Sequence, residues 1–249
     1  GGGGGDASGS GGGDAEAEGE GGGGSPGKRL LAVLRCIAAA THWPARRDFS
    51  TQDAVEALRA GGAKHLVGVW HETVAEASVH AGGMRDGGEE LIPLVRTLEY
   101  GGVEAGGGGK GGASSGGDGT RHGLYQFRHL TVQEALAAMD AVDDPQTGVT
   151  FGGHIEAVES LLNDEWYCSM CRIGGGRLCD AMCRLDGAWV FSSAPRPLSA
   201  HGVLALSYLA ACSTRLHTLS LEGTALGEAD VSATLALVRS LARSRVAKL

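Results

Sequence analysis

The chain has 249 residues, enough for one or two domains with a sizeable core. Lysine and arginine number 21 against 29 acidic residues, for a net charge of −8. No basic stripe with interleaved aromatic residues appears, which disfavours nucleic acid as a partner. No apolar run approaches the roughly 20 residues that cross a bilayer, so no membrane association is expected. Six cysteines without a secretory signal suit a reducing compartment, and we predict a cytoplasmic protein.

Glycine is concentrated in two stretches. Residues 1–27 hold 15 of the 44 glycines, and residues 101–119 hold another 11. Such stretches have too little apolar surface to offset the entropy of ordering. We therefore predict a disordered acidic tail over 1–27 and a disordered loop over 101–123. Residue 1 is Gly rather than Met, and we expect the chain to be a piece of a longer protein.

Residues 28–139 predict three helices and then a two-stranded wing. The helical spacing of apolar side chains indicates one helix from Lys28, a second after the capping-box sequence 50–53, and a third over 66–77. Alternating residues over 90–100 and 124–130 predict two antiparallel strands joined by the glycine-rich loop. In the first strand Ile92, Leu94 and Leu98 are expected on one face and Leu91 and Val95 on the other, and in the second Tyr125, Phe127 and His129 are expected on one face. This order of elements is that of a winged helix. A DNA-binding role is disfavoured because the third helix carries no Lys or Arg.

Residues 131–134 then cap another helix, whose predicted buried stripe is Val132, Leu136 and Met139. A helical segment over 140–187 follows, with helices expected at 155–162, 166–173 and 177–185. The predicted fold class is mainly α with small β.

Residues 188–249 predict a degenerate cap and the first leucine-rich repeat of a solenoid. The repeat skeleton is formed by Leu216, Leu219, Leu221, Thr224 and Leu226. A helix carrying Val231, Leu235, Val238 and Leu241 is expected next. A step of 28 residues places Phe191 at the position of Leu219, and the same step forward places Leu249 where another strand would begin. The exposed alternate residues of the strand would form a partner-binding surface: His217, Thr218, Ser220 and Glu222.

The segment Tyr125-Gln-Phe-Arg-His-Leu-Thr-Val-Gln-Glu-Ala-Leu-Ala-Ala138 closely resembles the F-x-H-L-[ST]-F-Q-E-[FY]-x-A-A segment of NACHT-type signalling NTPases. Its matching residues are Tyr125, Phe127, His129, Gln133 and Glu134. Val132 replaces the family's Phe. The order of winged helix, helical stretch and leucine-rich repeats also agrees over residues 28–249, although only 125–138 is specific.

The resemblance implies a molecular switch. In that family ADP holds the winged-helix arm against the nucleotide domain, exchange for ATP releases it, and the released protein oligomerises. His129 matches the histidine that contacts the ADP β-phosphate, and an imidazole can donate a charge-assisted hydrogen bond to phosphate. The implied partners are a NACHT nucleotide domain in the same protein and protein ligands of the repeats. ADP or ATP with Mg²⁺ would be bound by a full-length parent.

The chain itself is not expected to be an enzyme. A phosphate-binding loop needs G-x-x-x-x-G-K-[ST] between a buried strand and a helix. Gly22–Gly27 and Lys28 match the first part, but Arg29 stands where Ser or Thr is required and no apolar strand precedes. Lys110 lies inside another glycine run. We expect no cofactor in this chain and no catalytic residue.

Two alternatives stay open beside the switch. Cys168, Cys171, Cys179 and Cys183 could supply four thiolates to a zinc ion in a zinc-stabilised interaction module. The same spacing also places each pair on one helix face as small apolar residues. The other alternative is a stand-alone leucine-rich-repeat adaptor, in which the winged helix only caps the repeats. The final Ala247-Lys248-Leu249 is a variant of a peroxisomal address, which we disfavour.

Overall fold

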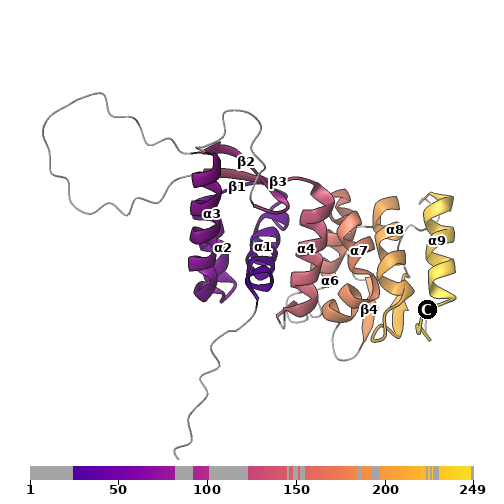
Figure 1. Cartoon of the computed structure of the whole chain (residues 1–249). Coiled ribbons are helices and arrows are strands. Elements are labelled where there is room, and N and C mark those ends of the chain that lie inside the picture. The colour runs from indigo at the N-terminus through magenta and orange to yellow at the C-terminus, as the bar shows by residue number, and fades with distance from the viewer. Residues whose placement is uncertain are drawn as a thin grey trace, which may run out of the picture.

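The computed structural model describes residues 25–81, 92–100, 123–144, 146–147, 151, 155–183, 187–191, 197–222, 224, 226 and 230–247. Of the predicted tail over 1–27 and loop over 101–123, residues 1–24 and 101–122 lie outside the described residues, whereas Pro26 and Gly27 begin α1 and Gly123 begins β3. The described part is mainly helical, with a small antiparallel and a small parallel sheet, and no helix in it is long and apolar enough to cross a membrane. The helices stand side by side in a row, with α2 and α3 on one side of α1 and with α4 to α9 following on its other side (Figure 1).

The first part is built from three helices and a three-stranded sheet. Its helices are α1 (Pro26–His42), α2 (Thr51–Ala60) and α3 (Val67–Ala81), with a 3₁₀ turn η1 (Lys64–Leu66) before α3. The strands are β1 (Asp48–Ser50), β2 (Val95–Tyr100) and β3 (Gly123–Phe127), antiparallel in the order β1-β3-β2. The sequence predicts only the last two. The wing is therefore three-stranded, because the short β1 pairs along β3.

Local signals explain why α2 begins where it does. Ser50 accepts a hydrogen bond from the backbone N–H of Asp53, and the Asp53 carboxylate accepts one from the backbone N–H of Ser50, which together form the predicted capping box. Val55 and Leu58 of α2 are buried, as are Leu66 and Trp70 near the start of α3. These predictions of helix position and inward face are confirmed.

In the wing, Leu94 and Leu98 lie opposite Val95 as predicted, and Ile92 departs from its predicted face. Ile92, Leu94 and Leu98 were expected on one strand face and Val95 on the other. In the structure Ile92 and Val95 are buried, whereas Leu94 and Leu98 are about two-fifths exposed. Residues 92–94 form a turn before β2 rather than strand, because Pro93 cannot donate to a sheet ladder.

The second part contains the helices α4 (Leu130–Asp143), α6 (Ile155–Asn163), α7 (Glu165–Met182), α8 (Ala200–Ala211) and α9 (Val231–Leu241). Two of the predicted helices, over 166–173 and 177–185, are one helix α7 with a kink at Gly175, where φ is 50° and ψ is −139°. Strands β4 (Ala188–Val190) and β5 (Thr218–Ser220) pair in parallel, each followed by a helix. These are two strand–helix units, and the described residues form no solenoid.

The predicted repeat period is wrong. Trp189 pairs with Leu219, so the two units are related by 30 residues and not by 28. The helix predicted to carry Val231, Leu235, Val238 and Leu241 is α9. Ala233 and Leu237 are its buried residues, while Val231, Leu235 and Val238 are exposed.

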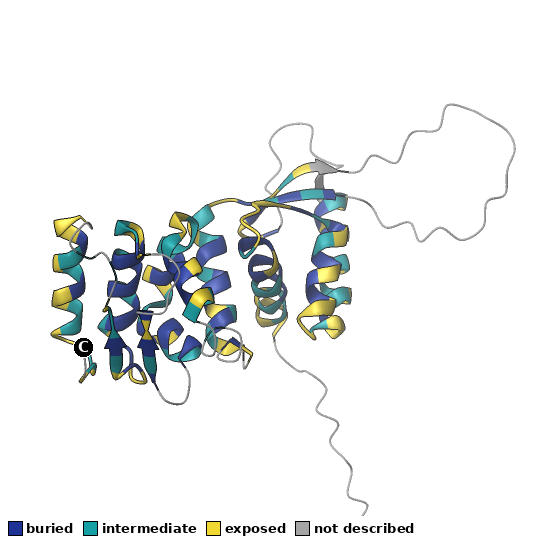
Figure 2. Ribbon diagram, turned by 180° about the vertical axis from the view of Figure 1, so that it is seen from behind, coloured by how far each residue is buried: buried dark blue, intermediate teal, exposed yellow. Residues whose placement is uncertain are grey.

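Helix α4 joins two hydrophobic cores. Leu136 belongs to the first core, with residues of α1–α3 and the sheet, and Ala137, Ala138 and Ala141 belong to the second, with α6–α9. The boundary predicted at residue 139 therefore falls inside this helix. Its expected stripe is also incomplete, since Met139 is 43% exposed. Figure 2 shows the buried faces of the row on both sides of α4.

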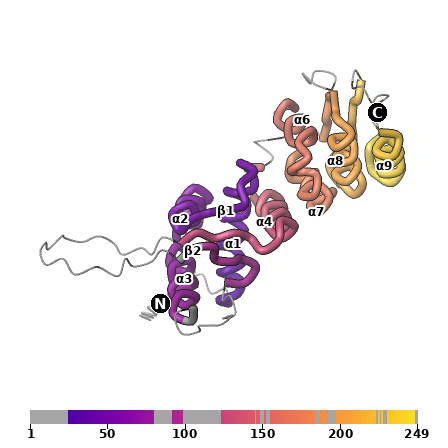
Figure 3. Tube along the Cα trace, turned by 90° about the horizontal axis from the view of Figure 1, so that it is seen from above, coloured from indigo at the N-terminus to yellow at the C-terminus, as the bar shows by residue number. Residues whose placement is uncertain are grey.

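A second contact, which we call the aromatic joint, links the two parts. It consists of His42 at the end of α1, Trp43 just after it, Phe151, and Trp166 and Tyr167 of α7. The indole Nε1 of Trp166 donates to the carbonyl of His42 over 3.0 Å, and the Tyr167 hydroxyl donates to the carbonyl of Trp43. Figure 3 shows α1, α4 and α7 following one another across this region.

Candidate functional site

His129 lies at the junction between the wing and α4. It is the N-cap residue of α4, with extended backbone angles (φ −131°, ψ 136°), and its side chain makes no capping hydrogen bond. Its carbonyl accepts hydrogen bonds from the N–H groups of Val132 and Gln133, over 3.1 and 3.3 Å. The side chain is exposed. His129 therefore presents an imidazole at the start of a fourteen-residue helix.

The preceding strand positions this histidine. In β3 the inward residues Tyr125 and Phe127 are each 1% exposed. Both rings pack on Phe49, with centroids 5.6 and 5.5 Å away, and Tyr125 also meets Trp70 edge-on at 5.3 Å. Such aromatic pairs add to the free energy of area burial and define ring orientation. The strand is therefore firmly placed up to the residue before Arg128-His129.

A strained turn lies beside the histidine. The backbone N–H of Arg128 donates to the carbonyl of Leu94 over 2.9 Å, so the chain before β2 is bound to the chain after β3. Leu94 has φ 67°, in the left-handed region that costs a non-glycine residue about 1–2 kcal/mol. Strain of this kind gathers at functional sites. Sequence reasoning missed this turn, although Pro93 was the available signal.

Hydrogen bonds of the Gln133 side chain connect α4 to the end of α1. Its side chain is fully buried, and its Nε2 donates to Thr41 Oγ1 over 2.9 Å and to the carbonyl of Arg46 over 2.8 Å. Both acceptors lie at or just after the end of α1. This glutamine has a structural role at the junction.

The carboxyl group of Glu134 connects α4 to α7. It is 4% exposed, and burial raises the pKa of its carboxyl, while Arg172 and a hydrogen bond with Ser169 oppose that rise. Both partners are residues of α7. Of the five motif residues, four are buried in cores or junctions, and His129 alone is exposed.

The residues predicted as a partner surface lie on or beside the parallel sheet. Trp189 and Leu219 face inward, at 2% and 0% exposure, and their neighbours face outward. His217 and Glu222 are exposed, and Thr218 and Ser220 are partly exposed. Val190 of β4, 43% exposed, lies beside Ser220 in the register. This outward face is a mixed polar and apolar surface of two adjacent strands.

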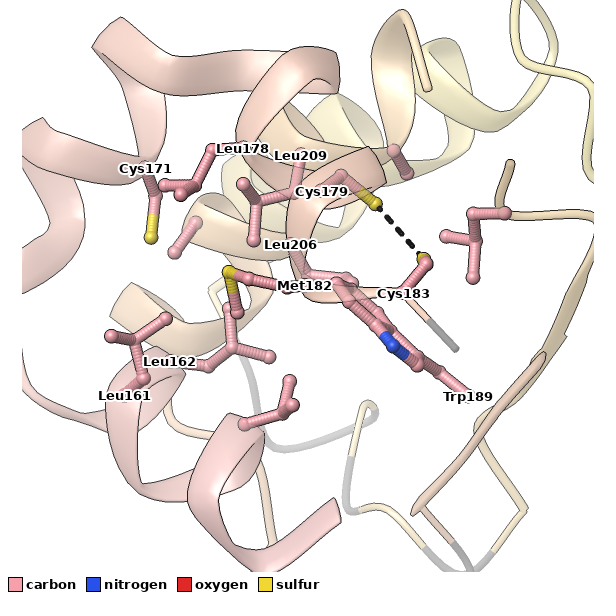
Figure 4. Close-up of a cluster of buried hydrophobic side chains, with 14 of the residues drawn as sticks. Leu161, Leu162, Cys171, Leu178, Cys179, Met182, Cys183, Trp189, Leu206 and Leu209 are labelled. Atoms are coloured by element: carbon pink, nitrogen blue, oxygen red, sulfur yellow. Dashed lines mark hydrogen bonds between the residues drawn. The ribbon is translucent and has the colours of Figure 1, made fainter. Parts of the chain in front are cut away.

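The four cysteines are not assembled as a zinc site. Among the described residues, no group of three or more His, Cys, Asp or Glu side chains is placed to hold a metal ion. The sulfurs of Cys179 and Cys183 lie 3.8 Å apart, near Met182 and Trp189, while Cys171 lies nearer the N-terminus of α7 (Figure 4). Burial raises the pKa of Cys171 to about 12 and that of Cys179 well above its ordinary value. These thiols pack as small apolar residues, and Cys168 is only partly buried.

The described residues contain no strand before Lys28, which lies in the first turn of α1. Lys110 is outside the described residues.

A groove of about 720 Å³ lies between α1, α2 and α4. Its charged lining is Arg35, paired with Asp143 over 2.8 Å, together with Asp140 and Asp144. The excess of carboxylates disfavours a phosphate ligand there.

Comparison with known proteins gives no match. No protein-family model, no curated protein and no solved structure matches the chain.

Proposed function

We propose that this chain is the regulatory and protein-interaction portion of a NACHT-type signalling NTPase. In this proposal residues 28–139 are a winged-helix switch arm, 140–187 a helical segment, and 188–249 the start of a leucine-rich-repeat array. Three helices with the sheet order β1-β3-β2 support the winged helix. Two parallel strand–helix units support the repeats. The proposal names no enzymatic activity for the chain itself.

The main support for the switch is a difference in solvent exposure within the motif segment 125–138. Tyr125, Phe127, Gln133 and Glu134 are buried, but His129 is exposed at a helix N-terminus. A helix N-terminus carries partial positive charge and unpaired N–H groups, which favour an anion. An imidazole placed there can reach a phosphate held by a separate domain and leave it when the arm moves.

The strand surface would serve as the sensor. His217, Thr218, Ser220 and Glu222 would contact a protein ligand, with Val190 adding apolar area. A stand-alone adaptor would use the same surface. It would differ from the switch in having no dependence on nucleotide state, and the following experiment separates the two.

The test uses the purified chain and a NACHT nucleotide-binding domain that has its own phosphate loop. Binding between them is measured by biolayer interferometry with ADP or ATP, each with Mg²⁺. We expect tighter binding in the ADP state, and His129→Ala should reduce that preference at least tenfold. His65→Ala, an exposed histidine in η1, is the matched control. Equal binding in both nucleotide states, or a preference untouched by His129→Ala, would contradict the switch.

A further inference from the structure

The groove between α1, α2 and α4 has no part in the proposed switch or in the strand surface. Helix α1 packs against both other helices and stands between them, so it forms the floor of the groove while α2 and α4 form the walls (Figures 1 and 3). Its volume of about 720 Å³ is large enough for several side chains of a ligand.

The C-terminal ends of all three helices meet at this groove. The residues that follow the last turns of α1, α2 and α4 are Trp43, Gly61 and Asp144, and each of them lines it. The C-terminus of a helix carries about half a negative elementary charge, which favours a cation within the last turn. Three such ends around one groove therefore favour a positively charged ligand.

Helix α4 adds carboxylates where its backbone is already negative. Asp140, Asp143 and Asp144 lie at helical spacing at its end, and its last turn holds no basic residue. Acidic side chains at this end of a helix reduce its stability. Among the described residues that line the groove, Arg35 is the one Lys or Arg side chain, and it is paired with Asp143 over 2.8 Å. The groove thus keeps an excess of negative charge.

The Asp140 carboxylate is the acidic group with the least compensation. It is half-buried, and it makes no hydrogen bond or ion pair with another described residue. The Asp144 carboxylate, in contrast, accepts the backbone N–H of Gln146 over 2.9 Å. Burial raises the pKa of Asp140, Arg35 opposes the rise, and Asp144 and Asp143 add to it. A cation placed beside Asp140 would offset this burial and repulsion.

The remainder of the groove is lined mostly by small apolar side chains. Ala39 and Ala40 of α1 face Ala57 and Ala60 of α2 across it, and the half-buried indole of Trp43 lies at its end. Ala40 and Ala60 are exposed. Small side chains allow another helix to approach closely, because the distance between helix axes depends on the side chains at the contact.

We infer that this groove binds an amphipathic helix of a partner protein, with Lys or Arg beside its apolar face. The apolar face would pack on the alanines and Trp43, and a Lys or Arg side chain would lie beside Asp140. A helix is favoured over an extended peptide because helices and their caps line the groove, whereas strand addition needs a sheet edge. The chain's own net charge of −8 favours a basic partner over a second copy.

This inference goes beyond the proposed function and is independent of it. The groove is lined neither by His129 nor by the residues of the strand surface. Its test involves no nucleotide, so the helix-binding groove and the nucleotide switch can fail separately.

The test measures peptide binding to the intact chain by fluorescence anisotropy. The probe is a fluorescein-labelled peptide of about 18 residues, long enough to form a helix, with Leu and Ala on one face and Lys on the other. A second peptide carries Glu in place of every Lys. We expect the Lys peptide to bind at least tenfold more tightly than the Glu peptide, and its affinity to fall as salt is added.

Two variants assign the binding to the groove. Asp140→Asn should weaken binding of the Lys peptide at least fivefold, and Ala40→Arg should do so as well because it places bulk and positive charge on the floor. Glu72→Gln is the matched control, since it removes one exposed carboxylate of α3, outside the groove. It should change the affinity less than twofold.

Three results would overturn the inference. One is equal affinity for the Lys and Glu peptides, and another is an effect of Glu72→Gln as large as that of Asp140→Asn. The third is a dimer of the chain alone, seen by sedimentation and dissociated by Asp140→Asn, because the occupant would then be a second copy.

Discussion

Burial of the His42 side chain lowers the stability of the folded protein when the imidazole must take up a proton. Its side chain is 0% exposed, it stacks on Trp166 with ring centroids 5.4 Å apart, and Tyr167 meets its edge at 5.4 Å. Among the described residues, neither ring nitrogen has a hydrogen-bond partner. Burial lowers the pKa of the imidazole to about 4, and Asp164 opposes the shift. His42 is therefore neutral in the folded protein, and it is protonated more readily in the unfolded chain.

The stability of the protein should depend on pH through this residue. A histidine with a lowered folded-state pKa leaves stability intact above its ordinary pKa of about 6.5 and costs stability as pH falls towards 4. At pH 4.5 the loss should be about 2.5 kcal/mol relative to pH 7.5. Urea unfolding of the wild type and of His42→Leu at the two pH values measures it. The carboxyls of Glu134 and Asp140 are present in both proteins, so their own pH dependence cancels. An identical loss in both proteins would contradict this assignment.

At the scale of elements, the close contact between α7 and the end of α8 depends on a glycine, Gly176. A Cβ added at Gly176 would overlap the carbonyl of Cys212 and the backbone nitrogen of Ser213, which follow α8. Glycine is thus required for the close approach of these two segments. The neighbouring Asp180 strengthens the contact, because its carboxylate accepts the backbone N–H groups of Thr214 and Arg215.

Gly176→Ala should lower the free energy of unfolding by about 2–3 kcal/mol, since backbone atoms must move to make room. Gly68→Ala in α3 is the matched control. A Cβ there meets nothing within 4 Å, so the substitution should raise stability by roughly 0.5–1 kcal/mol through helix propensity. Denaturant unfolding of both variants gives the comparison. A neutral Gly176→Ala would mean that the two segments are less closely packed than described.

How far the elements were predictable depended on the strength of local signals. The capping box at Ser50 and the apolar spacing through Trp70 were enough to place α2 and α3. The three-residue β1 was missed because a strand this short is defined by its partner β3 and not by its own pattern. The buried face of α9 could not be predicted from the sequence, since Leu235 is as apolar as Leu237 and only the neighbouring helix decides which of them is covered. The exposure of His129 likewise needed the structure, because alternation along β3 predicted it to share the buried face of Phe127.

At the scale of the whole molecule, two cores meet along α4 and the aromatic joint. Gln133 and Glu134 connect α4 to either side, and Trp166 and Tyr167 hold the end of α1. We expect wild-type protein to unfold as one cooperative unit for this reason. Trp166→Ala removes the stacking on His42 and the hydrogen bond to its carbonyl, and it should separate the two halves.

Hydrogen exchange under native conditions tests this prediction. In Trp166→Ala, amides of α1–α3 should exchange with a free energy different from that of α7 and α8 by at least 1 kcal/mol, whereas in the wild type the slowest amides of both halves should agree. Trp70→Ala, a substitution inside the first core, serves as the control that destabilises without removing the joint. Continued agreement between the halves in Trp166→Ala would show that α4 alone couples them.

The proposed switch arm would respond to nucleotide through a separate domain, so the chain by itself is expected to bind neither ADP nor ATP. A calorimetric titration of the purified chain with ADP and with ATP, each with Mg²⁺, tests this most directly. We predict no binding heat up to millimolar nucleotide, because Lys28 follows no described strand and Arg29 stands where the phosphate loop needs a hydroxyl. Micromolar binding that is lost on Lys28→Ala would contradict the account and assign a working phosphate loop to the start of α1.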